Sequence, residues 1–195
     1  GILILELSAD PTVFLFAGHR KGRVLFEELG GSIDSGEHVN IAAAREAREE
    51  SCNALIFDPR SLSRSTHVDL GTYRCFVGTL PHGVPIEDVY TRNRITLHNR
   101  HGVNKHYKET FSVSKVHLSD MLFAGIHLWS PSYKPFEVMD VNNKRIQLFN
   151  RTSGVLKLLL KDNVLVNATR FKLKGISEET AGPLRDTTSL KIMAE

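Results

Sequence analysis

Three glutamates lie close together in the alanine-rich segment IAAAREAREES. Glu46 precedes Glu49 by three positions and Glu50 by four, so on a helix their carboxylates would share one face. Like charges at this spacing cost roughly a few tenths of a kcal/mol per pair in an isolated helix, and a bound divalent cation would reverse that cost. Three hard oxygen donors beside open positions suit Mg²⁺ or Mn²⁺, which take further ligands from phosphates.

The same acidic stretch also permits a purely structural interpretation. Arg45 and Arg48 alternate with the glutamates and could neutralise them on a solvated helix face. A pair of glycines, Gly30 and Gly31, precedes the stretch and would let the backbone approach a ligand closely, where a side chain would obstruct it. On these residues alone, the metal site and the solvated helix both stay open.

The segment from Gly31 to Asn53 resembles the Nudix box, G-x5-E-x7-R-E-U-x-E-E-x-G-U, where U is a bulky aliphatic residue. Six specified positions match, namely Gly31, Glu37, Arg45, Glu46, Glu49 and Glu50. With each residue type at about one position in fifteen, six matches at fixed spacing arise by chance roughly once in ten million starts. The preceding FEELGG is also similar to the family's W-E-L-P-G-G, with Leu29 in place of proline.

Two positions depart from the box. Cys52 stands where the family has glycine, and Asn53 stands where it has an aliphatic residue. The glycine is expected to end the helix in a left-handed conformation, which Cys disfavours and which Asn tolerates better than most residues. We therefore expect the helix to run one residue further and to end at Asn53.

The resemblance implies a role for each residue of the box. Glu46, Glu49 and Glu50 would be metal ligands, and Glu49 and Glu50 would be central to catalysis. Arg45 would hold these carboxylates in place through ion pairs and so support catalysis. Glu37 would brace the loop against the helix and could also reach the metal.

Further site residues are expected outside the helix. The backbone of Gly30 and Gly31 would contact the substrate, and one of their carbonyls could complete the metal coordination. Many family members place a glutamate at the start of a later strand, facing the metal. Glu109 has that context and would be the general base; alternatively it is a surface charge paired with Lys105 or Lys108.

The activity implied by the resemblance is hydrolysis of the phosphoanhydride in a nucleoside diphosphate linked to another moiety, with Mg²⁺ or Mn²⁺ as cofactor. Two alternatives stay open, namely removal of the cap from messenger RNA and a catalytically silent Nudix-fold module that binds nucleotide or RNA. The expected partner is a nucleotide-like diphosphate, RNA is possible, and a homodimer is possible because the family often dimerises.

Basic residues crowd the segment before the candidate base. They are Arg92, Arg94, His98, Arg100, His101, Lys105, His106 and Lys108. We expect residues 87–104 to form a long loop. Since Arg is suited to bidentate phosphate contacts, we expect Arg92, Arg94 and Arg100 to bind substrate, with a solvated surface loop as the alternative.

Two smaller groups of residues could also contact a nucleotide. His19 and Arg20 could reach a base or a phosphate, although we expect them to face solvent after a strand. Trp129, Tyr133 and Phe136 could stack on a base, but core or lid packing is the favoured interpretation.

The spacing of apolar residues predicts the elements that position this chemistry. Strands are predicted at Ile2–Leu7, Val13–Ala17, Val24–Leu29, Ser65–Leu70, Thr72–Leu80 and Glu109–Leu118. Ile41–Ser51 is predicted as a helix with Asn40 as its N-cap, a short helix begins at Ser119, and Arg145–Lys161 holds one broken helix or two short ones. This order indicates an α+β fold, and the resemblance implies a Nudix-type α/β/α sandwich with a mixed β-sheet.

Composition places the chain among ordinary globular proteins. With 195 residues, 41% hydrophobic and 24% charged, it is not expected to be disordered or a coiled coil. A net charge of +3 is too small by itself to indicate nucleic-acid binding, although a local basic cluster could still support it. We expect a Nudix-like domain at 1–162 and a partly flexible C-terminal extension at 163–195.

Cellular location is predicted from cysteine content and apolar runs. Two cysteines do not make a disulfide scaffold, which favours a reducing compartment. No apolar run approaches the roughly 20 residues that span a bilayer, and the N-terminus does not resemble a secretion signal. We therefore expect a cytoplasmic or nuclear protein that is neither secreted nor membrane-bound.

Overall fold

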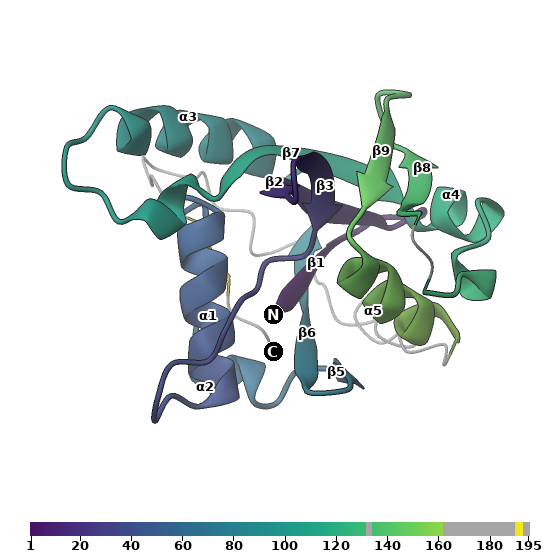
Figure 1. Ribbon diagram of the computed structural model, residues 1–195, viewed down its shortest axis with the longest axis horizontal. Helices are drawn as coiled ribbons and strands as arrows, with labels where there is room; N and C mark the ends of the chain where they lie inside the picture. Colours follow the sequence, from purple (N-terminus) through teal and green to yellow (C-terminus); the bar gives the residue numbers. More distant parts are fainter. Residues whose placement is uncertain (132–133, 162–189, 193–195) are drawn as a thin grey trace.

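The computed structural model describes residues 1–131, 134–161 and 190–192. A mixed β-sheet lies between two groups of helices (Figure 1). Its strands are β1 (Ile2–Leu7), β2 (Thr12–Arg20), β3 (Arg23–Glu27), β5 (His67–Leu70), β6 (Tyr73–Pro81), β7 (Thr110–His117), β8 (Phe136–Met139) and β9 (Arg145–Leu148). They follow the order β5-β6-β1-β2-β3-β9-β8, and β7 also pairs with β2.

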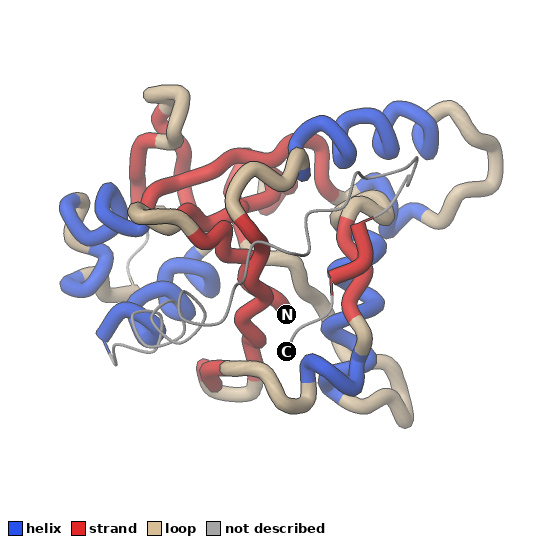
Figure 2. The backbone as a smooth tube through the Cα atoms, turned by 180° about the vertical axis from the view of Figure 1, so that it is seen from behind, coloured by secondary structure: helices blue, strands red, loops and turns tan. Residues whose placement is uncertain are grey.

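The helices of the described residues lie on both faces of this sheet. They are α1 (Val39–Glu50), α2 (Pro59–Leu62), α3 (Ile86–His98), α4 (Leu118–Phe123) and α5 (Asn150–Lys161), with short 3₁₀ turns η1 (Lys105–Lys108) and η2 (Ile126–Leu128). A separate parallel pair joins β4 (Leu55–Phe57) to β10 (Leu190–Ile192). Figure 2 shows the same elements from behind.

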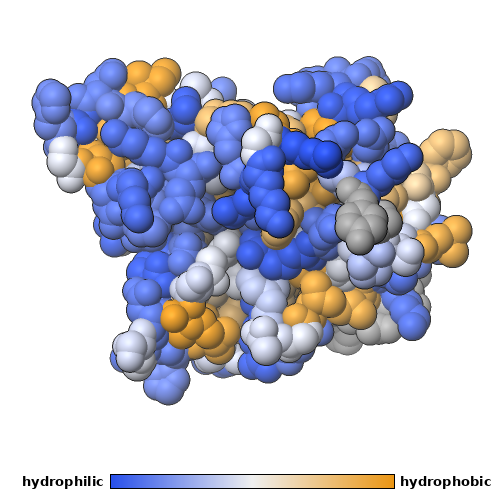
Figure 3. Space-filling view, viewed as in Figure 1, coloured by the Kyte–Doolittle hydropathy of each residue, from blue (hydrophilic) through white to orange (hydrophobic). Residues whose placement is uncertain are grey.

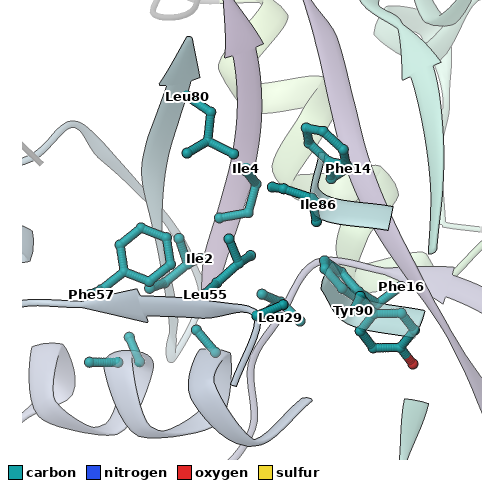
Figure 4. Close-up of a cluster of buried hydrophobic side chains, with 14 of the residues drawn as sticks. Ile2, Ile4, Phe14, Phe16, Leu29, Leu55, Phe57, Leu80, Ile86 and Tyr90 are labelled. Atoms are coloured by element: carbon teal, nitrogen blue, oxygen red, sulfur yellow. The ribbon is translucent and has the colours of Figure 1, made fainter. Parts of the chain in front are cut away.

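The central strand β1 is buried along its whole length, and its alternating side chains supply two cores. Ile2 and Ile4 belong to the first core, which lies under α1 and α3 (Figure 4). Leu3 and Leu5 belong to the second core, which lies under α4 and α5. β1 runs antiparallel to β2 and parallel to β6. The predicted α+β class with a mixed sheet is therefore confirmed.

The predicted loop at residues 87–104 is wrong, because most of it forms α3. Ile86, Val89 and Tyr90 have helical spacing and are buried in the first core. Burial of this apolar face stabilises the helix more than repulsion among its basic side chains destabilises it. Glu87 and Asp88 in the first turn also favour the positive end of the helix dipole. The basic content of the segment concealed this short apolar stripe.

Both predicted ends of the acidic helix are also wrong. His38 is the N-cap of α1, and the Asn40 side chain donates instead to the Pro59 carbonyl at 2.7 Å. At the other end, the last helical residue is Glu50, and Cys52 (φ 55°) and Asn53 (φ 60°) are both left-handed. Cys52 takes up the conformation expected of the family's glycine, so the helix does not run on to Asn53.

Hydrogen bonds stabilise this left-handed ending. The Cys52 N–H donates to the Glu49 carbonyl at 3.0 Å, and the Asn53 N–H donates to the Arg48 carbonyl at 2.8 Å, which is the paired pattern of a Schellman ending. The Cys52 side chain is fully buried, and its Sγ lies 3.4 Å from the Tyr107 carbonyl. Burial and these bonds offset the strain of a non-glycine residue at positive φ.

Arg145–Lys161 forms strand β9 followed by the single helix α5, rather than one broken helix or two. Gly154 lies inside α5 and does not break it. A Cβ on Gly154 would lie 2.8 Å from Cδ2 of Leu70, so the glycine allows close approach of α5 to β5.

Most of the predicted C-terminal extension, 163–195, lies outside the described residues, which include only β10 of that segment. Tyr133 also lies outside them. Within the described ranges, no helix has the length and apolar character needed to cross a membrane.

Glu6 is a buried carboxylate at the end of β1. Its Oε1 accepts from the Gly83 N–H at 2.8 Å and its Oε2 accepts from the Thr12 hydroxyl at 3.0 Å. Burial raises the pKa of Glu6, but these hydrogen bonds and the Lys115 ammonium 3.6 Å away outweigh it, so the pKa is lowered overall. The charged form of Glu6 therefore links β1 to Thr12 on β2, to Lys115 on β7 and to Gly83 just after β6.

We predict that Glu6→Gln lowers the free energy of unfolding by about 1–3 kcal/mol near neutral pH. Because the folded pKa is lowered, the wild-type advantage exists above the unfolded pKa of about 4.3 and fades as pH falls through the folded value. Urea denaturation at about pH 7 and about pH 3.5 measures this difference. Glu137→Gln, on an exposed glutamate, is the control, and a Glu6→Gln deficit that does not change with pH would contradict the assignment.

Candidate active site

Four of the five predicted acidic site residues line one cavity of about 580 Å³, here called the acidic cavity. Its wall includes Glu46, Glu49 and Glu50 from α1, together with Glu109, the residue just before β7. The backbone of Gly30 and Gly31, just after β3, forms another part of the wall. Segments far apart in sequence therefore meet at this place, and hydrophilic residues gather over this face (Figure 3).

Small residues let α1 lie close to the sheet. Ala43, Ala44 and Ala47 of α1 pack into the first core, and this leaves Glu46 and Glu50 buried at the edge of that contact. The alanines favour the helix and occupy little space. The helix period then places Glu49 in the wall of the same cavity.

Arg45 binds three of the carboxylates at once. Its Nη1 donates to Glu46 at 2.9 Å and to Glu49 at 3.4 Å, while its Nε and Nη2 donate to the two oxygens of Glu37 at 3.0 and 2.9 Å. Its Nη2 also donates to the Ser32 carbonyl at 2.9 Å. These bonds raise the pKa of Arg45, and the hydrogen bonds from Arg45 lower the pKa of Glu37.

Glu37 braces the loop but does not line the cavity. Besides its two bonds with Arg45, its Oε2 accepts from the Asp34 N–H at 3.1 Å. The structure thus places Glu37 behind Arg45, where it holds the loop to the helix, rather than beside the other three acids.

Glu50 is the most enclosed acid of the cavity, with 3% of its surface exposed. Its Oε2 accepts from the Gly30 N–H at 2.6 Å. Burial raises the pKa of Glu50 well above its ordinary value, and the nearby charges of Glu27 and Glu46 raise it further. An enclosed acid of this kind favours either a proton or a cation.

Gly31 faces the carboxylate of Glu46 at very short range. A Cβ at this position would lie 2.6 Å from both carboxylate oxygens, so any side chain would displace Glu46. At Gly30, a Cβ would lie 2.5 Å from the Tyr73 hydroxyl oxygen. Gly31 therefore leaves room for Glu46, Gly30 leaves room for Tyr73, and both place backbone in the cavity wall.

The donor set fits a hard divalent cation. Glu46, Glu49 and Glu50 supply only carboxylate oxygens, the ligands that Mg²⁺ and Mn²⁺ prefer. The acids are not preassembled, because within the described ranges no three His, Cys, Asp or Glu side chains are grouped as a metal site. Arg45 shares its charge with Glu46 and Glu49, which offsets the repulsion between these two carboxylates.

Glu109 is held at the cavity by its neighbours. The Thr110 hydroxyl donates to the Glu50 carbonyl and accepts from the Tyr90 hydroxyl, so the start of β7 is tied to the end of α1. The Oε1 of Glu109 lies 2.6 Å from Nδ1 of His106. Among the described residues, Glu109 therefore contacts His106 rather than Lys105 or Lys108, the lysines considered from the sequence.

Arg20 and Arg151 line the acidic cavity, although only Arg20 was considered from the sequence and was expected to face solvent. Arg20 Nε donates to Glu27 at 2.9 Å. Arg151 Nε donates to Glu28 at 2.7 Å, and its Nη2 lies 3.2 Å from the Gly30 carbonyl. The available signal was the pair of adjacent glutamates Glu27 and Glu28 within the predicted strand Val24–Leu29, since a charge that a strand buries needs a partner.

The structure does not bring the three predicted substrate arginines to the acidic cavity. Arg92 and Arg100 line a separate cavity of about 410 Å³ beside Cys52, and Arg94 Nε donates to the Thr110 carbonyl at 3.3 Å. The reason is that α3 packs its apolar stripe on the first core, so that Arg92 and, after the helix, Arg100 lie beside Cys52 and Asn53 at the end of α1.

The remaining described candidates, His19, Trp129 and Phe136, do not line the acidic cavity. His19 stacks against Phe111 with ring centroids 4.8 Å apart and is exposed. Trp129 and Phe136 pack against the second core, which confirms their predicted packing role.

Comparison with models of protein families and with curated proteins found no match to this chain.

We predict that Arg45→Gln lowers the free energy of unfolding by about 1–3 kcal/mol, the range for losing hydrogen bonds to charged groups. The variant leaves Glu37, Glu46 and Glu49 without their shared cation. Arg48→Gln, on the exposed arginine of the same helix, should cost less than about 1 kcal/mol. Chemical denaturation of both variants measures this, and equal small losses would show that Arg45 does not hold the site together.

Proposed function

We propose that this chain is a divalent-metal-dependent hydrolase of the Nudix type. It cleaves the phosphoanhydride of a nucleoside diphosphate linked to another moiety. The observation that carries the proposal is the convergence of Glu46, Glu49, Glu50 and Glu109 around one cavity with a bare glycine backbone in its wall. A solvated helix face would not need burial of Glu50 or a side-chain-free position at Gly31.

Glu46, Glu49 and Glu50 would hold Mg²⁺ or Mn²⁺, because they offer three hard oxygen donors in one cavity. When bound, such a cation polarises a phosphoryl oxygen, neutralises the leaving phosphate and lowers the pKa of an attacking water. Arg45 positions Glu46 and Glu49, and Glu37 holds Arg45 from behind.

Glu109 is the candidate general base. It lines the same cavity, and its hydrogen bond with His106 fixes the carboxylate in place. Glu109 takes the proton of the attacking water while a new P–O bond forms to the water oxygen and the P–O bond of the anhydride breaks. The products are two phosphate-bearing fragments, and the proton is then released to solvent.

Arg20 and Arg151 add positive charge to the acidic cavity, besides that of Arg45. Both guanidinium groups are held by buried glutamates, so little side-chain freedom is lost when a phosphate arrives. Their remaining N–H groups are suited to phosphate oxygens.

We predict that Glu50→Gln lowers kcat by more than about 100-fold, because losing a ligand should cost more than the 10–100-fold typical of a supporting residue. The Gly30 N–H keeps an oxygen acceptor, so the fold should persist. The assay compares nucleoside diphosphate sugars, dinucleoside polyphosphates, nucleoside triphosphates and capped RNA, each with Mg²⁺, Mn²⁺ or EDTA.

The matched control is Glu87→Gln, on a glutamate of α3 outside the acidic cavity, and it should retain activity. Mn²⁺ should raise the melting temperature of the wild type but not that of Glu50→Gln. Undiminished turnover in a folded Glu50→Gln protein would contradict the proposal. Release of capped nucleotide alone would favour cap removal.

A catalytically silent binding module is the second candidate. The observation that favours it is that Arg45 hydrogen-bonds Glu46 and Glu49, two of the three candidate metal ligands. Nucleotide binding by the wild type without hydrolysis of any substrate in the same panel would favour this candidate over the enzyme.

A further inference from the structure

A second cavity, here called the basic cavity, adjoins the acidic one. Its volume is about 680 Å³, and it shares Arg20 and Phe149 with the acidic cavity. Its wall includes Lys21, from the turn between β2 and β3, and Arg23, the first residue of β3. No Asp or Glu is among its described lining residues. A cavity with several carboxylates in its wall and a cavity with none among its described lining residues therefore share Arg20 and Phe149.

The β2–β3 turn sets three cations side by side. Arg20 and Arg23 are directly paired across the two strands, and like charges in that arrangement oppose strand pairing. Lys21 and Gly22 form the turn with φ of 49° and 75°, where Asn or Gly is favoured over Lys. Neither the charge pattern nor the lysine is explained by the stability of the turn.

Two of these cations are free to bind a ligand. Arg20 is paired with Glu27 at 2.8 Å, whereas neither Lys21 nor Arg23 has a side-chain hydrogen bond or an ion pair with any residue in the described ranges. Both are exposed at the rim of the basic cavity. An anion entering it would meet two unpaired positive charges and the partly engaged guanidinium of Arg20.

Apolar groups complete the basic cavity. Leu25, Pro135 and Phe149 line it together with the cations, and Phe149 also lies in the acidic cavity. A single extended molecule could thus place one phosphate beside the acids and another beside Lys21 and Arg23. An uncharged group such as a sugar gives the two free cations no partner.

We propose that the basic cavity binds a further phosphate on the second moiety of the substrate, so that the preferred substrates are small molecules carrying phosphate beyond the bond that is cleaved. This inference rests on the proposed function for the position of that bond. The class comprises compounds with a longer polyphosphate chain and compounds whose second moiety is itself a nucleotide. Nucleoside diphosphates joined to a neutral sugar lie outside it.

The first experiment measures binding without catalysis. Inorganic tripolyphosphate is titrated calorimetrically into the full chain in EDTA, with wild type, the double variant Lys21→Asn/Arg23→Thr, and the control Arg64→Gln. Asn accepts the positive φ of the turn and Thr suits a strand, so the double variant should fold, as its melting temperature will verify. We expect at least about a tenfold weaker Kd for the double variant, since two charge-assisted contacts are lost.

The control removes an exposed arginine that lines neither cavity, and its Kd should change less than about twofold. Equal binding by wild type and the folded double variant, or no binding by either, would overturn the proposal. Equal weakening in the control would assign the binding to net charge alone and would also overturn it.

The second experiment measures specificity. The ratio of kcat/KM for a dinucleoside tetraphosphate to that for a nucleoside diphosphate sugar should fall at least about tenfold in the double variant, and an unchanged ratio would contradict the proposal. A parallel assay with a nucleoside tetraphosphate distinguishes a preference for a longer polyphosphate from a preference for a second nucleotide. If the wild type cleaves none of these compounds, the proposed function fails, while the tripolyphosphate titration still decides whether the basic cavity binds phosphate.

Discussion

The guanidinium of Arg45 is the cation on which the arrangement of the candidate site depends. It joins Glu46 and Glu49 of its own helix to Glu37 and to the backbone of the preceding loop. Without this charge, the carboxylates at helical spacing would repel one another. Because Arg45 holds the loop against α1, the glycine backbone also lies within reach of the enclosed Glu50.

Local sequence was sufficient to predict much of the scaffold and the acidic part of the cavity. The alternating strands and the alanine-rich helix follow from the spacing of apolar residues, and the grouping of Glu46, Glu49 and Glu50 follows from the helix period. Their metal ligation stays a prediction. Glu109 was expected near them only through the family resemblance, and the ties through Thr110 that hold it there had no local signal.

The parts that sequence could not predict depend on contacts between distant segments. Arg151 pairs with Glu28 across 123 positions, and no spacing rule connects them. The apolar stripe of α3 is short and lies among charged residues. The segment was therefore predicted to be a loop, and its arginines were predicted to bind substrate. Cys52 adopts a left-handed conformation that its residue type disfavours, because burial and the hydrogen bonds at the end of α1 compensate for it.

The central claim is that the carboxylates of α1 form a binding site for a divalent cation beside a glycine backbone. Anomalous diffraction from crystals of the chain grown with Mn²⁺ tests it most directly. The account predicts a manganese peak within coordination distance of Glu50 and of at least one of Glu46 and Glu49. Crystals that bind manganese elsewhere, or show no peak while Arg45 keeps both acids, would contradict it.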